Sequence, residues 1–169
     1  MQVYSRPREG DETLVDTLST GAHGHFAYSV DARASQALHF AYPGTTTRLP
    51  AEDRVAVLVA GRSTFAVTRT RILNGQSVVF SGRVQGRPLP VGGKLIELQF
   101  WVSNEWSTFR TIRSKANGRW RIPYRFQRTC GVQRFRFRAR LPGEAGYPLE
   151  AGHSPILAVR VRGRPCSTG

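Results

Sequence analysis

Hydrophobic and polar residues alternate along most of this chain. The alternation is clearest in six stretches that are rich in β-branched and aromatic side chains. These stretches are 76–84, 94–102, 107–112, 118–126, 133–141 and 156–162. Asn74-Gly75, Gly92-Gly93 and Asn117-Gly118 punctuate them, and such pairs supply the positive φ of tight hairpin turns. No stretch of helical length shows a capped 3.6-residue period, so the pattern predicts an all-β chain.

The stretch "RFRFRAR" (134–140) places an arginine at every second position. Because successive strand residues point to opposite faces, its phenylalanines and alanine should face the core while its arginines face outward. We expect the last strand and the strand 94–102 to lie on either side of it, with matching parity. The predicted outer face then holds Arg134, Arg136, Arg138, Arg140, Arg160, Arg162 and Trp101, beside the carboxylate of Glu97.

Two distant segments of the chain are similar in sequence. "DTLSTGAHGHFAYSV" (16–30) aligns without a gap onto "RTIRSKANGRWRIPY" (110–124), at a constant offset of 94 residues. A turn glycine and an inward aromatic residue recur in the same order, and 55–62 falls on 157–164 after a change in length. This order predicts a duplicated module of about 100 residues, the size of a seven-stranded β-sandwich.

The duplication divides the chain into two tandem antiparallel β-sandwich modules, residues 1–64 and 65–169. At the same offset Met1 falls near Leu95, so the first module has no counterpart of residues 71–84 and lacks its first two strands. We therefore expect an exposed apolar flank and unpaired strand edges in the first module. Either the product is short, or its start lies inside a longer reading frame; the second interpretation is favoured.

Several short motifs follow one another over residues 77–161, namely "FSGRV", "GGKLIELQ", "NGRWR", "FRFRA" and "AGYPLEAGHS". They resemble the tandem bacterial Ig-like, or carboxypeptidase-regulatory-like (transthyretin-like), modules of actinobacterial surface proteins. The resemblance implies Ig-like β-sandwiches that serve as a non-enzymatic extracellular structural or spacer module, without a cofactor. It carries no ligand and no functional residue across to this chain.

Charge is distributed unevenly between the two halves. Residues 1–66 carry a net charge of −1 and residues 67–169 carry +15, within a total of +14. The outer face of "RFRFRAR" is therefore either a solvated surface, whose aliphatic stems cover the sheet, or an anion-binding surface. Arginine suits the second role because its guanidinium binds phosphate and carboxylate bidentately. The alternative function is thus an anion- or glycan-binding accessory domain.

The partners expected for such a face are an acidic wall polymer, an anionic glycan or a layer of lipid head groups. We do not expect nucleic acid, because no nucleic-acid-binding motif accompanies the basic sheet. No apolar run is long enough to span a bilayer, and the first residues show no signal peptide in this reading frame.

The two cysteines flank neighbouring predicted strands. Cys130 lies just before "RFRFRAR", and Cys166 lies just beyond the last strand. Since antiparallel neighbours place the start of one strand beside the end of the other, the two thiols should lie within bridging reach. The alternative is a pair of unrelated free thiols. A disulfide favours an oxidising, extracellular or cell-surface location.

Two histidine patterns suggest chemistry and are better explained by structure. His23 and His25 form an H-x-H pair, yet His23 falls on Asn117 at a left-handed turn position and His25 takes an outward strand position. His153 and Ser154 are adjacent on a loop, and adjacent loop residues form no triad without an orienting acid. The sequence therefore predicts no catalytic residue and no metal ligand.

Overall fold

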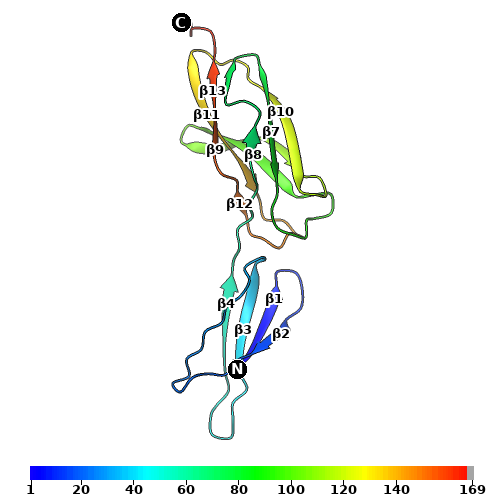
Figure 1. Cartoon of the computed structure of the whole chain (residues 1–169), viewed down its shortest axis with the longest axis vertical. Coiled ribbons are helices and arrows are strands. Elements are labelled where there is room, and N and C mark those ends of the chain that lie inside the picture. Colours follow the sequence, from blue (N-terminus) through cyan, green and yellow to red (C-terminus); the bar gives the residue numbers. More distant parts are fainter. Residues whose placement is uncertain (167–169) are drawn as a thin grey trace. The chain divides into compact units, whose positions relative to one another are not determined.

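The computed structural model describes residues 1–166 and contains only strands and turns, with no helix among those residues (Figure 1). This confirms the prediction of an all-β chain. Contacts along the chain divide it into two compact units. Unit 1 comprises Met1–Val59 together with Pro148–Glu150, and unit 2 comprises the remainder from Ala60 onward.

Unit 1 contains one antiparallel sheet of four strands in the order β2-β1-β3-β4. The strands are β1 (Gln2–Pro7), β2 (Thr13–Thr17), β3 (Gln36–Tyr42) and β4 (Ala51–Val57). Its core is small and consists of Val3, Leu38 and Phe40, against which Tyr28 and Val30 pack from the segment between β2 and β3.

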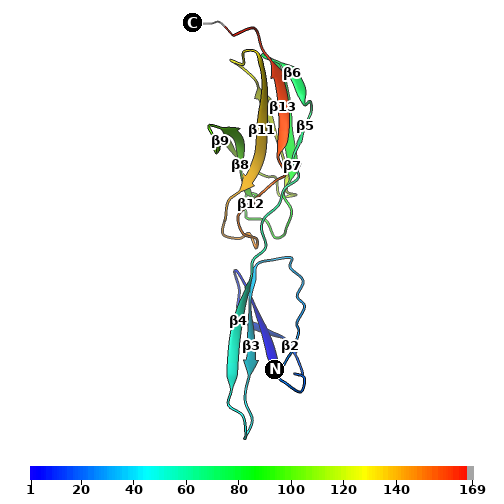
Figure 2. The ribbon, with the colours of Figure 1, turned by 90° about the vertical axis from the view of Figure 1, so that its left-hand side faces the viewer.

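Unit 2 contains two sheets that face each other. The smaller sheet has the order β10-β7-β5, with β5 (Ala66–Val67), β7 (Ser77–Arg83) and β10 (Arg119–Arg125). The larger sheet has the order β6-β13-β11-β8-β9, with β6 (Arg71–Leu73), β8 (Leu95–Val102), β9 (Glu105–Arg113), β11 (Val132–Leu141), β13 (Leu157–Arg162) and β12 (Gly152–His153) beside β11. Figure 2 shows the strands of unit 2 from a second direction. The rings of Phe80 on β7 and Phe137 on β11 lie 4.9 Å apart, so side chains of both sheets fill one core.

The register of the larger sheet agrees with the predicted alternation. Strand β11 pairs with β13 on one side and with β8 on the other, antiparallel in both cases. Phe137 and Ala139 are buried, as are Val159 and Val161 on β13. The arginines between them point to the opposite face because the side-chain period of a strand is two.

One predicted turn detail is wrong. We placed the left-handed residue of two hairpins at His23 and Asn117, but the positive φ falls one residue later, at Gly24 (78°) and Gly118 (81°). A type I turn followed by a left-handed glycine has this pattern, and it assigns the strained position to the residue without a Cβ.

An apolar flank of unit 1 is exposed, as expected. On the face that carries the buried Leu38 and Phe40, Val55 is 48% exposed and Phe26 is 41% exposed. Residues 25–31, which follow the Gly24 turn, belong to no strand.

Candidate anion-binding site

The outer face of the larger sheet of unit 2 gathers every residue predicted for it. Arg134 lies opposite Arg160, while Arg138 and Arg140 lie opposite Gln99 and Glu97. The residues of this arginine face are Arg134, Arg136, Arg138 and Arg140 from β11, Arg160 and Arg162 from β13, and Trp101 from β8. The structure adds two members that the sequence analysis missed, Arg71 and Trp106.

At one end of the face, Arg138 and Arg140 are hydrogen-bonded within their own sheet. The Arg140 guanidinium donates to the Glu97 carboxylate at 2.6 Å, and Arg138 Nε donates to Gln99 Oε1 at 2.8 Å. Burial, followed by the nearby charge of Arg140, lowers the pKa of Arg138. The group remains a cation at neutral pH, because arginine is not deprotonated in proteins.

The middle of the face is a stack of guanidiniums on indoles. Arg136 lies over the Trp101 ring, 5.0 Å from its centroid, and Arg138 lies over the Trp106 ring at 4.3 Å. Such contacts contribute about 0.5–1 kcal/mol each at exposed sites. Arg136 therefore covers the Trp101 ring from one side.

Trp106 was missed because the hairpin that carries it is tighter than expected. We began the strand after 94–102 at residue 107, whereas β9 begins at Glu105. Ser103 and Asn104 both have positive φ, 47° and 63°, so a two-residue turn places Trp106 directly opposite Trp101. Asn104 is the sequence signal for this turn, since asparagine tolerates the left-handed region.

The other end of the face is an open arginine cluster, which we define as Arg71, Arg134, Arg160 and Arg162. Arg160 lies opposite Arg71 on one neighbouring strand and opposite Arg134 on the other. Three guanidinium stems thus form a row across β6, β13 and β11, about 4.8 Å from strand to strand. Within residues 1–166 none of the four forms a salt bridge. Arg71 was missed because a strand of three residues, β6, shows too little alternation.

Two shallow depressions border this row. One, of about 370 Å³, is lined by the arginines of β6 and β13 with Leu73 and Val132. The other, of about 380 Å³, is lined by Arg134 with Ala158 and Val132. Cationic walls over a small apolar floor suit a ligand that presents spaced carboxylate or phosphate groups to several guanidiniums at once.

A second basic depression lies on the smaller sheet of unit 2. It has a volume of about 590 Å³, and Arg83 and Arg119 lie opposite each other within it. Lys115 and Arg121 also line it. The sequence pattern "RWR" at residues 119–121 could have indicated it, because both arginines fall on the outer face of β10.

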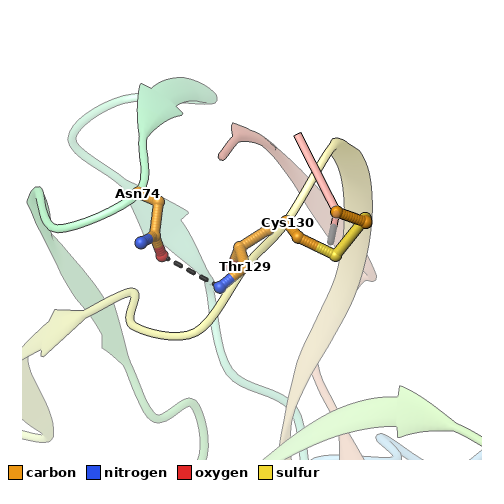
Figure 3. The surroundings of a disulfide bond; sticks show 4 residues. Asn74, Thr129 and Cys130 are labelled. Atoms are coloured by element: carbon orange, nitrogen blue, oxygen red, sulfur yellow. Dashed lines mark hydrogen bonds between the residues drawn. A yellow bond between two sulfur atoms is a disulfide. The ribbon is translucent and has the colours of Figure 1, made fainter. Parts of the chain in front are cut away.

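The predicted disulfide is confirmed. Cys130 and Cys166 are bonded, with their Cα atoms 4.9 Å apart. Figure 3 shows the bond beside the segment before β11, where the amide of Thr129 donates to Asn74 Oδ1 at 3.1 Å. These links tie the segments that flank β11 and β13 at the end of the sheet where the open arginine cluster lies.

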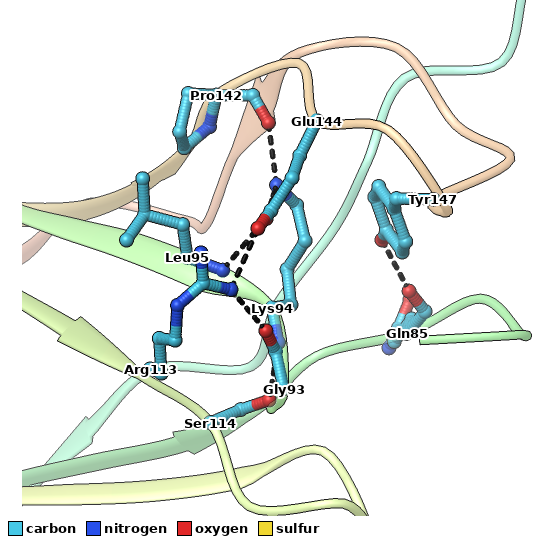
Figure 4. A network of polar contacts seen from close by, with 9 residues as sticks. All are labelled: Gln85, Gly93, Lys94, Leu95, Arg113, Ser114, Pro142, Glu144 and Tyr147. Carbon is cyan, nitrogen blue, oxygen red and sulfur yellow. Dashed lines mark hydrogen bonds and ion pairs between the residues drawn. The ribbon is translucent and has the colours of Figure 1, made fainter. Parts of the chain in front are cut away.

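A buried ionic network holds the loop after β11 against the start of β8 (Figure 4). Lys94 is fully buried, and its Nζ donates to the Pro142 carbonyl at 2.6 Å and to Glu144 Oε2 at 2.9 Å. Arg113 donates to the other oxygen of Glu144 at 2.6 Å. The ring of Tyr147 lies under the ammonium group, 5.0 Å away. Both carboxylate oxygens are therefore occupied, and the network is structural.

Two side chains of this network, Glu144 and Tyr147, have shifted pKa values. Burial by itself would raise the pKa of Glu144, but hydrogen bonds from the Leu95 amide, Lys94 and Arg113, together with the charge of Lys94, outweigh burial and lower that pKa to about 2. Burial raises the pKa of Tyr147 to about 12. The Tyr147 hydroxyl donates to the Gln85 carbonyl, which further fixes the loop.

Ser154 and His153 have structural contacts. The Ser154 hydroxyl is buried, accepts from the Ala139 amide at 2.9 Å and donates to the Pro155 carbonyl. His153 Nδ1 lies 3.0 Å from the Ser154 carbonyl rather than from its hydroxyl. Among residues 1–166, no group of three His, Cys, Asp or Glu side chains is placed to hold a metal ion.

Compared with known proteins, the sequence matches no family model and no curated protein. The part of the chain that the structure describes contains no helix of the length and apolarity needed to cross a membrane.

Proposed function

We propose that this chain is a non-enzymatic, extracellular or cell-surface binding module. In this proposal two Ig-like units form the scaffold, and the open arginine cluster of unit 2 binds an anionic polymer, such as an acidic wall polymer or an anionic glycan.

The row of Arg71, Arg160 and Arg134 carries the proposal. Like charges directly opposite each other in a sheet are destabilising by a few tenths of a kcal/mol each. The neighbouring arginines of β11 are offset by Glu97, Gln99 and indole rings, whereas this row has no such partner in residues 1–166. A polyanion would relieve that repulsion and supply charge-assisted hydrogen bonds.

The location rests on the disulfide. Disulfides persist in oxidising environments and are rare where thiols are kept reduced. Cys130 and Cys166 therefore favour an extracytoplasmic setting, which is where acidic wall polymers and glycans are found.

Salt-dependent retention on immobilised polygalacturonate tests the proposal. Reversing two charges of the row, with Arg134→Glu and Arg160→Glu, should weaken retention roughly tenfold or more, since each lost contact is worth about 0.5–1 kcal/mol. The matched control is Arg83→Glu with Arg119→Glu, which reverses an opposite pair on the other sheet and changes the net charge equally.

A greater loss of retention with Arg134→Glu and Arg160→Glu than with Arg83→Glu and Arg119→Glu supports the site, and a greater loss with the control pair contradicts it. Equal loss would mean that net charge alone retains the protein, which contradicts it. Anionic phosphatidylglycerol vesicles and duplex DNA serve as competitors, and stronger binding to either would assign the cluster to another class of partner.

A structural spacer is the second candidate, and the Lys94 network favours it. Unit 2 is fixed internally by a buried ion pair and a disulfide, as suits a rigid stalk. If the unmodified protein shows no salt-sensitive retention on any of these polyanions, the spacer is the better interpretation.

A further inference from the structure

Unit 1 reproduces the strand order of the larger sheet of unit 2. Its order is β2-β1-β3-β4, and unit 2 contains the run β9-β8-β11-β13. The turn after β2 in unit 1 and the turn after β9 in unit 2 have the same backbone hydrogen bond. The Gly21 amide donates to the His25 carbonyl at 2.9 Å, and the Lys115 amide donates to the Arg119 carbonyl at 2.8 Å. The two sheets can therefore be compared position by position.

The two units differ directly after this turn. In unit 2 the next segment is β10, which pairs with β7 along its whole length, from Arg119 opposite Arg83 to Arg125 opposite Ser77. In unit 1 the equivalent segment, residues 25–31, pairs with no strand among residues 1–166. Its backbone edge is left available for another strand.

The exposure of the apolar side chains also differs between the two units. Trp120 on β10 is 4% exposed because it lies opposite Gly82 of β7 and its ring packs 5.5 Å from that of Phe65. The equivalent Phe26 is 41% exposed. Phe26 still turns inward, since its ring lies 5.3 Å from that of Phe40. On the same face Val55, which lies opposite the buried Leu38, is 48% exposed. The uncovered surface of unit 1 thus coincides with the place that β7 occupies in unit 2.

We propose that unit 1 is a β-strand acceptor. An extended strand from a partner polypeptide pairs with residues 25–31 and places alternate apolar side chains over Phe26 and Val55. Unit 2 indicates the chemistry of this strand: like β7, it has bulky apolar residues at alternate positions facing the core, as Val78 and Phe80 are, while Ser77, Val79 and Ser81 lie on its other face. Strand addition of this kind combines main-chain hydrogen bonds with pockets for alternate side chains.

A peptide with the sequence of residues 76–84 is a direct probe. Added to the full chain at millimolar concentration, it should slow amide hydrogen exchange at residues 25–31 by at least roughly tenfold, because these amides would enter a ladder. The control peptide carries Val78→Ser and Phe80→Ser, which keeps the charge and length but removes the apolar side chains. Phe26→Glu in the chain should abolish the protection.

A tethered version removes dependence on affinity. A second copy of residues 71–94 fused before Met1 reproduces the connection that leads from β7 into β8 in unit 2, and tethering gives an effective concentration in the millimolar range. Residues 25–31 should then be protected without added peptide, while a fused copy with Val78→Ser and Phe80→Ser should give no protection.

The proposal of a strand acceptor is contradicted if the amides of residues 25–31 exchange as fast with the fused copy as without it, or if both fused copies protect these amides equally. Protection by the fused copy but not by the free peptide would show that a separate strand of this sequence binds too weakly at millimolar concentration, which contradicts a separate partner. Protection that rises with protein concentration alone, together with dimers in sedimentation, would instead identify a second copy of this chain as the donor.

Discussion

Lys94 shows how unit 2 tolerates a fully buried charge. A buried ammonium is costly unless it is paired and hydrogen-bonded. Here Glu144 supplies the opposite charge, Pro142 supplies a carbonyl, and the Tyr147 ring covers the remaining side. Removing one partner should therefore cost more than an ordinary exposed ion pair, because it leaves the other charge buried.

Glu144→Gln tests this argument. The substitution removes the carboxylate that pairs with Lys94 and Arg113, and we expect it to lower the free energy of unfolding by about 2–3 kcal/mol at pH 7. Glu105→Gln, at an exposed carboxylate in the first position of β9, should change it by less than about 0.5 kcal/mol. Urea unfolding followed by tryptophan fluorescence measures both, and equal effects would contradict the structural role of the network.

We also expect Glu144 to make the stability of the protein depend on pH in the acid range. The pKa of Glu144 is lowered from 4.5 to about 2 in the folded state, so its contribution is present above pH 4.5 and is lost as the pH falls toward 2. Glu144→Gln should remove that part of the acid destabilisation. In urea unfolding between pH 5 and pH 2.5, the variant should therefore lose less stability than the unmodified protein. Parallel pH profiles would show that Glu144 is not the group responsible.

Sequence reasoning could not have found this network. A lysine at the start of a strand usually faces solvent, and the acid that pairs with Lys94 lies in a loop 50 residues later. The arginines of β11 were predictable because strand parity is local, whereas the burial of Lys94 depends on a loop whose path no local pattern gives.

At the scale of elements, two adjacent glycines before β8 have different requirements. Gly92 and Gly93 both have positive φ, 79° and 86°. A Cβ on Gly92 would meet no atom within 4 Å, but a Cβ on Gly93 would lie 1.8 Å from the Ser114 carbonyl oxygen. The sequence identified the pair as a turn without distinguishing its two members.

Gly92→Ala and Gly93→Ala form a matched pair. The first should cost about 1–2 kcal/mol, the conformational penalty of a left-handed alanine. The second adds a backbone clash that forces β8 and the segment after β9 apart, so we expect a loss of at least about 3 kcal/mol. Thermal melts by circular dichroism measure both, and similar melting temperatures would contradict the packing at Gly93.

A second prediction at the scale of elements concerns the contribution of the disulfide to the stability of unit 2. It closes a loop between positions 36 residues apart, for which the chain-entropy model gives about 4 kcal/mol at most. Cys130→Ala with Cys166→Ala should lower the stability of unit 2 by about 2–4 kcal/mol and make it insensitive to dithiothreitol. A variant that is as stable as the oxidised protein would show that β11 and β13 need no covalent link at this end.

The elements that sequence patterns predicted are those whose alternation is long. Strands β7, β8, β11 and β13 were placed within one or two residues of their bounds. The two-residue strand β12 and the Ser103-Asn104 turn were missed, because each is specified by a partner strand more than by its own sequence. The three-residue strand β6 was expected only as one of two strands within residues 71–84, without its place beside β13. Two members of the arginine face, Arg71 and Trp106, were lost with them.

At the scale of the molecule, the two units differ in how much core they contain. Among the described residues, the buried hydrophobic side chains of unit 1 are Val3, Leu38, Phe40 and Leu149. Unit 2 buries several times as many, between two facing sheets. Hydrophobic burial is the dominant favourable term in folding, so unit 1 should be the less stable unit.

The positions of the tryptophans make this difference measurable. Trp101, Trp106 and Trp120 all lie in unit 2, so tryptophan fluorescence follows unit 2 alone, while far-ultraviolet circular dichroism follows the strands of both units. We expect the dichroism signal to begin changing at a lower urea concentration than the fluorescence. Phe137→Ala, which removes a ring from the core of unit 2 at a cost of about 3–5 kcal/mol, should move the fluorescence transition and leave the first dichroism change in place. Coincident transitions in the unmodified protein would mean that the two units unfold as one cooperative body, which the small core of unit 1 argues against.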